Sequence, residues 1–295
     1  ADMLLISTTK SGKDYSTLKE IYSELIGQRI RELGHVANVV GGILRTERYA
    51  GTDGVVFSPF TKEKQKEAMD LLTKEAFKIK VTKDGPYLVS GKLPLIKEKI
   101  IFNKRGESVA WEKVQDYPSQ ENYALCRCGQ SKNKPYCDDS HLKVKFVGTE
   151  MASKQKYNEC AEIIEGPELD LKDYPKLCAL ARFCDRIGGT WALTEKSDNP
   201  EFKQVAIHQA CDCPSGRLVA VNKKTGQDIE PNFEPSASLV EDTTVQVSGP
   251  IWVKGGVQIE SANGKPYEKR NRVTLCRCGQ SRNKPYCDAS HGREI

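Results

Sequence analysis

The sequence predicts an α+β protein with an N-terminal helical segment, two copies of a small β-rich unit and a cysteine-rich insert between the copies. Three observations support this prediction. A sixteen-residue segment rich in Cys and His occurs twice, short strand-like runs precede each copy, and apolar residues at helical spacing recur early in the chain. We therefore expect four regions, which are residues 1–78, 79–150, 151–236 and 237–295.

The N-terminal region is expected to be helical and accessory. A capping-box pattern at residues 17–20 precedes apolar residues at helical spacing, and a second helix is predicted over residues 61–77. From residue 79 onward, Gly, Pro and Asp punctuate short apolar runs, which favours antiparallel strands. These runs are residues 79–81, 87–89, 100–102, 245–247 and 251–253. A weaker repeat precedes each Cys/His segment, since Gly-Pro begins a strand-like run in both halves, at Gly85 and Gly249.

Composition limits the possible partners. The 295 residues include 45 Lys and Arg against 40 Asp and Glu, and the net charge of +5 is spread without a basic block, so we expect no nucleic-acid partner. No apolar run is long enough to span a bilayer and no secretory signal is visible, so we expect no membrane association. The 11 cysteines are an odd number, which predicts a reducing, cytoplasmic setting where thiols serve as metal ligands.

The repeated segment carries three cysteines and one histidine in each copy. The first set is Cys126, Cys128, Cys137 and His141, and the second is Cys276, Cys278, Cys287 and His291. Cys-x-Cys places two thiolates at one strand end or tight loop, and an Asp after the third Cys is a good N-cap for one helical turn that returns the His beneath it. Three sulfurs and one nitrogen suit structural zinc and an iron–sulfur cluster alike, so the spacing leaves both open.

The whole segment resembles the CDGSH iron–sulfur family, whose pattern is Cys-x-Cys-x2-Ser/Thr-x3-Pro-x-Cys-Asp-Gly-Ser/Ala/Thr-His. The two copies match at every ligand position, and the departure is at the family's Gly, which is Asp139 in one copy and Ala289 in the other. If that position requires a positive φ, Asp139 tolerates it better than Ala289. The resemblance implies one [2Fe–2S] cluster per segment, with two Cys on the inner iron and Cys plus His on the outer. It also implies that the two β-rich units pair as a pseudo-dimer within one chain.

Four further cysteines lie in two clusters between the copies: Cys178, Cys184, Cys211 and Cys213. The last of them begins Cys-Pro-Ser-Gly, and this part of the chain resembles the divergent single-cluster [4Fe–4S] ferredoxin domain over residues 160–220. That resemblance implies a [4Fe–4S] cluster on these four thiolates. A structural zinc site and reduced core thiols also remain open for them.

These features predict an iron–sulfur protein that acts in electron transfer or in cluster storage and transfer. No catalytic motif is present, so we expect a carrier and not an enzyme. Its partner would be a redox protein or an apo-acceptor protein, and the internal pairing favours a monomer. Two alternatives stay open: a zinc-stabilised interaction module without redox activity, and the electron-donating subunit of an oxidoreductase.

Overall fold

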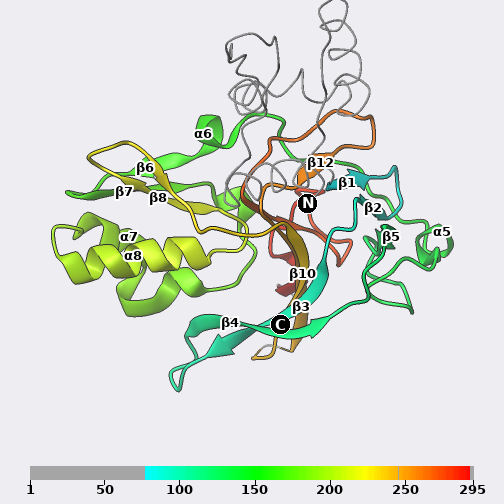
Figure 1. Ribbon diagram of the computed structural model, residues 1–295, viewed down its shortest axis with the longest axis horizontal. Coiled ribbons are helices and arrows are strands. Elements are labelled where there is room, and N and C mark those ends of the chain that lie inside the picture. The colour runs from blue at the N-terminus through cyan, green and yellow to red at the C-terminus, as the bar shows by residue number, and fades with distance from the viewer. Residues whose placement is uncertain (1–76, 245, 293–295) are drawn as a thin grey trace, which may run out of the picture. The chain divides into compact units, whose positions relative to one another are not determined.

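The structure, a computed structural model, describes residues 77–244 and 246–292 and confirms the α+β class. Two mixed β-sheets and a third, antiparallel sheet covered by two helices make up this part of the chain (Figure 1). The helices expected within residues 14–77 lie outside the described residues. Among the described helices, none combines the length and the apolar character that are needed to cross a bilayer.

Three regions supply the described secondary-structure elements, while the boundaries expected from the sequence stay predictions. The first β-rich unit supplies β1 (Lys78–Val81), β2 (Tyr87–Ser90), β3 (Leu95–Phe102), β4 (Ser108–Asp116), β5 (Asn122–Leu125) and α5 (Ser140–Lys143). The insert supplies α6 (Tyr157–Cys160), β6 (Glu162–Ile164), β7 (Leu169–Asp173), the 3-10 turns η1 (Pro175–Leu177) and η2 (Phe183–Gly188), α7 (Thr190–Glu195), α8 (Pro200–Asp212), β8 (Leu218–Asn222) and β9 (Asp228–Ile229). The second β-rich unit supplies β10 (Ser236–Asp242), β11 (Val247–Lys254), β12 (Gln258–Glu260), β13 (Arg272–Leu275) and the 3-10 turn η3 (Ser290–Gly292).

The two β-rich units exchange strands. The strand orders are β12-β1-β2-β5 and β13-β11-β10-β3-β4, so β12 of the second unit completes the sheet of the first, and β3 and β4 of the first unit extend the sheet of the second. The expected antiparallel pairing holds within each unit, whereas the strand pairs that join the units are parallel, β1 with β12 and β3 with β10. This intertwined arrangement is the internal pairing that the family resemblance implies.

Alternating burial fixes the faces of these strands. In β1, Ile79 and Val81 are fully buried while Lys78 is exposed, as the two-residue period of a strand requires. Apolar side chains from both units form one shared core. A buried ion pair also joins the units, because Nζ of Lys254 lies 2.6 Å from a carboxylate oxygen of Glu98. Removing one partner would leave the other charge buried and unpaired, a loss of about 3–5 kcal/mol.

The insert forms its own small core. Helices α7 and α8 pack on the sheet β6-β7-β8-β9, with Leu169, Leu171 and Leu218 fully buried between them. Helix α8 begins at Asn199, whose side chain accepts hydrogen bonds from two backbone N–H groups of the first turn, and Pro200 occupies the first helical position. Phe183 of η2 packs with aromatic residues of the five-stranded sheet, and this contact joins the insert to the β-rich units.

Candidate metal centres

The first ligand set is brought together as two pairs. Cys126 and Cys128 follow β5, and their Sγ atoms lie 3.8 Å apart. Cys137 and His141 flank the start of α5, and Sγ of Cys137 lies 3.5 Å from Nδ1 of His141. The N–H of Gln130 points at Sγ of Cys128 over 3.4 Å and would stabilise a bound thiolate, while burial raises the pKa of the free Cys128 thiol. The helical turn expected to start after Asp138 begins only at Ser140, because Asp139 has a left-handed backbone. A reverse turn through Asp138 and Asp139 therefore returns the histidine to the third cysteine.

The second ligand set repeats this geometry. The Sγ atoms of Cys276 and Cys278 are 3.7 Å apart, and Sγ of Cys287 lies 3.4 Å from Nδ1 of His291. Burial raises the pKa of the Cys287 thiol above its ordinary range, so binding a metal here must release a proton. Burial, followed by the charge of Arg277, lowers the pKa of His291, which favours the neutral imidazole that a metal requires.

The two-by-two arrangement distinguishes a two-iron cluster from a single zinc ion. Around one tetrahedral ion, all four ligand atoms lie about 3.5–3.8 Å from one another. Among the described residues, only Cys137, Asp139 and His141 bring three potential ligand atoms within 4.8 Å of one another, and neither thiol of the Cys-x-Cys pair joins them. Two separated pairs fit a [2Fe–2S] cluster, in which each iron takes one pair of protein ligands.

The two ligand loops touch each other through reciprocal glycine contacts. Gly129 has φ +76°, and a Cβ built there would lie 2.6 Å from the carbonyl oxygen of Cys278. Gly279 has φ +83°, and its Cβ would lie 2.6 Å from the carbonyl oxygen of Cys128. Each glycine thus lets its loop approach a ligand residue of the other site, which no larger side chain permits.

Sequence reasoning missed the arginine inside each Cys-Arg-Cys motif. Arg127 is almost fully buried, donates to the carbonyl oxygens of Thr82 and Gly148 and lies over the ring of Tyr87. Arg277 donates to the carbonyl oxygens of Gly249 and Val240 and to the carboxylate of Glu241. Both guanidinium groups tie a ligand loop to its unit. The signal was present, since the arginine is repeated in both copies although it is not a ligand.

The turn after the third cysteine is organised by an aspartate. Asp138 accepts hydrogen bonds from the backbone N–H groups of Lys132 and Ser140, and these hold the pKa of its carboxyl well below the ordinary range. Asp288 makes the same bonds in the second copy. The next residue has a positive φ in both copies, 61° at Asp139 and 68° at Ala289. The family's Gly position thus does adopt the left-handed conformation, and Ala289 carries the greater strain.

A tyrosine secures the second ligand loop and has no equivalent at the first. The hydroxyl of Tyr87, in β2, donates to the carbonyl oxygens of Cys276 and Pro285 over 2.8 and 3.0 Å. Burial raises the pKa of Tyr87, so the hydroxyl stays protonated and remains a donor. The matching residue of the second unit is Ile251, which lines a cavity of about 150 Å³ together with Cys126 and Pro135. The first ligand loop therefore lacks this cross-unit support.

The insert brings three of its four candidate ligands together. Cys178 follows η1 and Cys184 lies in η2. Cys184 and Cys213 both pack against the small core of the insert. Burial, then the charges of Asp185, Cys213 and Cys178, raises the pKa of Cys184. Between the first two cysteines, Leu180 and Arg182 both have left-handed backbones, with φ 59° and 60°. Such strain at non-glycine residues is typical of ligand-binding loops.

Cys211 is placed differently. Its Sγ lies 3.8 Å from the carbonyl oxygen of Ile229, and among the described residues no contact joins it to the other three insert thiols. The backbone around it is held by Arg272, a fully buried residue of β13 that sequence reasoning also missed. The Arg272 guanidinium donates to the carbonyl oxygens of Ala210, Cys211 and Cys213 over 2.7–2.8 Å. This arginine links the insert's cysteine loop to the strand that leads into the second ligand set.

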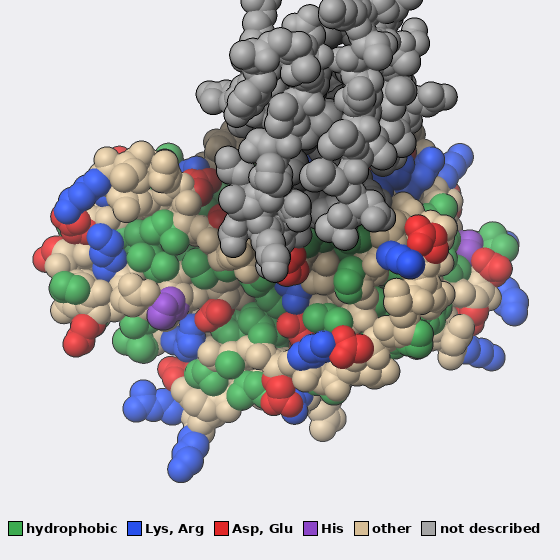
Figure 2. All heavy atoms as spheres, in the orientation of Figure 1, with side chains coloured by type: hydrophobic (Ala, Val, Ile, Leu, Met, Phe, Trp, Pro, Cys, Tyr) green, Lys and Arg blue, Asp and Glu red, His purple; other side chains and the backbone are tan. Residues whose placement is uncertain are grey.

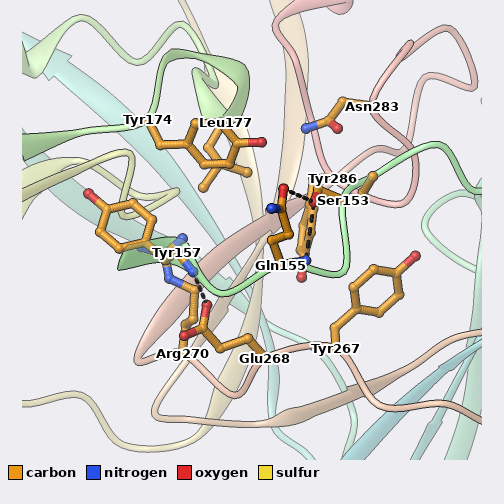
Figure 3. A pocket seen from close by; sticks show the side chains of 11 residues that line it. Ser153, Gln155, Tyr157, Tyr174, Leu177, Tyr267, Glu268, Arg270, Asn283 and Tyr286 are labelled. Atoms are coloured by element: carbon orange, nitrogen blue, oxygen red, sulfur yellow. Dashed lines mark hydrogen bonds between the residues drawn. The ribbon is translucent and has the colours of Figure 1, made fainter. Parts of the chain in front are cut away.

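The insert also contacts the second ligand loop directly. The side chain of Asn283 donates to the carbonyl oxygen of Lys176 over 2.9 Å, and Cys178 contributes to the electrostatic surroundings of Cys287. Figure 3 shows the adjoining pocket, where Tyr174 and Leu177 of the insert face Tyr286 of the ligand loop. Its volume is about 30 Å³, enough for a water molecule and too small for a substrate. It is a packing junction between the insert and the second site.

Comparison with protein families agrees with this geometry. Residues 84–142 and 248–292 each match the family described as "Iron-binding zinc finger CDGSH type". Residues 164–223 match the family described as "Divergent 4Fe-4S mono-cluster". Searches among curated proteins and among solved structures give no match to this chain. The chain is therefore an iron–sulfur protein that carries two CDGSH segments with a divergent 4Fe-4S segment between them.

Proposed function

We propose that the chain is an electron carrier that holds two [2Fe–2S] clusters and one [4Fe–4S] cluster. When bound, such clusters supply one-electron redox chemistry, while the protein sets their potential and exposure. The observation that carries the proposal is the contact between ligand loops. The loops of the two CDGSH sites meet at Gly129 and Gly279, and Asn283 of the second ligand loop donates a hydrogen bond to the carbonyl oxygen of Lys176 in the insert.

The ligands are assigned residue by residue. Cys126, Cys128, Cys137 and His141 would hold one [2Fe–2S] cluster, and Cys276, Cys278, Cys287 and His291 the other. Cys178, Cys184 and Cys213 would hold the [4Fe–4S] cluster, with Cys211 as the fourth ligand after its thiol turns away from Ile229. The left-handed backbone at Leu180 supports a binding loop between the first two of these cysteines.

The chain's partner in this proposal is another redox protein, and the chain itself transforms no substrate. The rival zinc module is disfavoured by the separation of each ligand set into two pairs. Cluster delivery to an apo-acceptor protein is the second candidate function. One observation favours it, because Cys137 and His141 are both partly exposed at the first site, where an acceptor thiolate would have access.

Redox titration of anaerobically purified protein tests the proposal. We expect reversible reduction and reoxidation in the visible spectrum, and an EPR signal of the reduced protein that Cys213→Ser removes while the CDGSH signals persist. Cys160→Ser is the matched control, because Cys160 contacts none of the candidate ligands among the described residues. Irreversible bleaching on reduction would contradict an electron carrier. Rapid appearance of the cluster in an added apo-ferredoxin would instead favour delivery.

A further inference from the structure

The internal repeat allows each surface of the second site to be compared with its match at the first. At the second site, the insert covers the residue after the histidine: a Cβ built on Gly292 would lie 2.6 Å from Cδ2 of Leu180. Asn283 is bonded to the insert backbone, and Arg182 of the insert forms an ion pair with Asp242 of β10 over 2.5 Å. Ala289 is accordingly buried, with 6% of its surface exposed.

The matching surface of the first site is open. Leu142 corresponds to Gly292, and 69% of its surface is exposed. Asn133 and Asp139 correspond to Asn283 and Ala289, and both are exposed. Nothing in the described part of the chain takes the place that the insert occupies at the second site. The same fold therefore presents one covered and one uncovered copy of this surface.

The uncovered copy combines apolar and basic side chains. We call it the α5 surface and define it by Leu142, Val144 and Val147 with Lys143 and Lys145. The three apolar residues are 50–69% exposed, and the two lysines are exposed and form no ion pair with any described residue. In Figure 2, hydrophobic, histidine, basic and acidic side chains meet at the edge of the molecule where Figure 1 labels α5. An apolar patch with a charged rim, adjoining a metal-ligand set, is typical of a protein-binding site.

We propose that the α5 surface is the docking site for a separate redox protein with an acidic contact face, and that the insert reserves the second site for contacts within the chain. The covered copy shows what such a partner does: it places an apolar side chain on the residue after the histidine, as Leu180 does on Gly292. The basic rim selects an acidic face by charge complementarity. This inference rests on the proposed electron-carrier function and names the partner of the first site.

Binding of an acidic one-electron carrier to the loaded full-length chain tests the inference. Plant-type ferredoxin is the probe, basic cytochrome c is the comparison, and calorimetry near 0.01 M salt gives Kd, because charges act over about 30 Å at that ionic strength. We expect binding of the ferredoxin and not of the cytochrome. The double variant Lys143→Glu and Lys145→Glu should raise Kd at least about tenfold. The matched variant Arg282→Glu, in the exposed part of the second ligand loop, should change Kd by less than about twofold.

Three results would overturn the docking site: no ferredoxin binding at low salt, equal weakening by the two variants, or concentration-dependent self-association that the lysine variant abolishes. The last result would make a second copy of this chain the occupant. Iron and sulfide content of each variant shows whether its clusters are intact. Since binding is measured without electron flow, a failed redox titration with ferredoxin binding intact counts against the proposed function and not against the surface.

Discussion

The contact between the two ligand loops gives a prediction whose size can be worked out from a matched pair of glycines. Gly129 and Gly106 have nearly the same backbone, with φ +76° and +77°. A Cβ at Gly106 meets nothing within 4 Å, whereas a Cβ at Gly129 lies 2.6 Å from the carbonyl oxygen and 2.9 Å from the carbonyl carbon of Cys278. Comparing Gly129→Ala with Gly106→Ala therefore separates the contact from the backbone strain.

The expected losses follow from these two terms. A side chain in the left-handed region costs about 1–2 kcal/mol, and the stiffer unfolded chain returns about 0.4–1 kcal/mol, so Gly106→Ala should lower the free energy of unfolding by about 1 kcal/mol. Gly129→Ala must also displace a ligand backbone, and forced overpacking adds about 1–3 kcal/mol. At about 2–4 °C per kcal/mol, Tm should fall about 2–12 °C further for Gly129→Ala than for Gly106→Ala.

Thermal unfolding followed by circular dichroism and by visible absorption provides the assay. Because Gly129 presses on Cys278, Gly129→Ala should also speed cluster loss at the second site, and Gly279→Ala should speed it at the first. The reasoning fails if Gly129→Ala and Gly106→Ala lower Tm equally. It also fails if each substitution disturbs only the cluster of its own loop.

Three further predictions address single positions of the ligand loops. Ala289→Gly should raise the free energy of unfolding by about 0.5–1 kcal/mol, and Asp139→Gly by less, because Asp tolerates a positive φ better than Ala. If denaturant titration shows that Ala289→Gly lowers the stability, the backbone at this position is not strained. Cluster loss should become faster as pH falls from 8 to 6. Burial lowers the pKa of His291, so the folded site binds fewer protons than a free imidazole of pKa about 6.5. The stability that this difference provides is lost as acid protonates the ring. His141→Cys and His291→Cys should each slow that loss at their own site, and a decay of visible absorption that is independent of pH would exclude imidazole as the labile ligand. In Ile251→Tyr, the new side chain should enter the cavity of about 150 Å³, and its hydroxyl should donate a hydrogen bond to the first ligand loop. A net gain of about 1 kcal/mol should raise Tm by about 2–4 °C. A lower Tm would show that the cavity does not accept the ring.

The sequence predicts the ligand sets well because their geometry is local. Cys126 to His141 spans sixteen residues, and a short turn through Asp138 and Asp139 returns the histidine to Cys137. The positive φ of the residue after Cys-Asp, where the family pattern has Gly, could also be anticipated, and Ala289 does have a positive φ. The α+β class followed from the strand-like runs, although β11 begins at Val247 after a turn at Gln246, and residue 245 of that run lies outside the described residues.

Contacts between distant segments leave no pattern in the sequence from which they could be predicted. The parallel pairing of exchanged strands, the reach of Tyr87 to the second ligand loop and the cover that Leu180 gives to Gly292 all join residues far apart in the chain. One signal was available, since Tyr87 aligns with Ile251 in the weak repeat, and a mismatch inside a repeat marks a place where the copies differ in environment. Arg272 offered no such signal, because an arginine at the first position of a strand is ordinarily a surface residue.

The iron and acid-labile sulfide content of anaerobically purified protein tests the central claim most directly. Two [2Fe–2S] clusters and one [4Fe–4S] cluster predict about eight iron and about eight sulfide ions per chain, with a brown-red colour. About four of each would leave the CDGSH sites intact and remove the insert cluster from the account. Stoichiometric zinc without sulfide, in a colourless protein, would contradict the assignment of both ligand sets to iron–sulfur clusters.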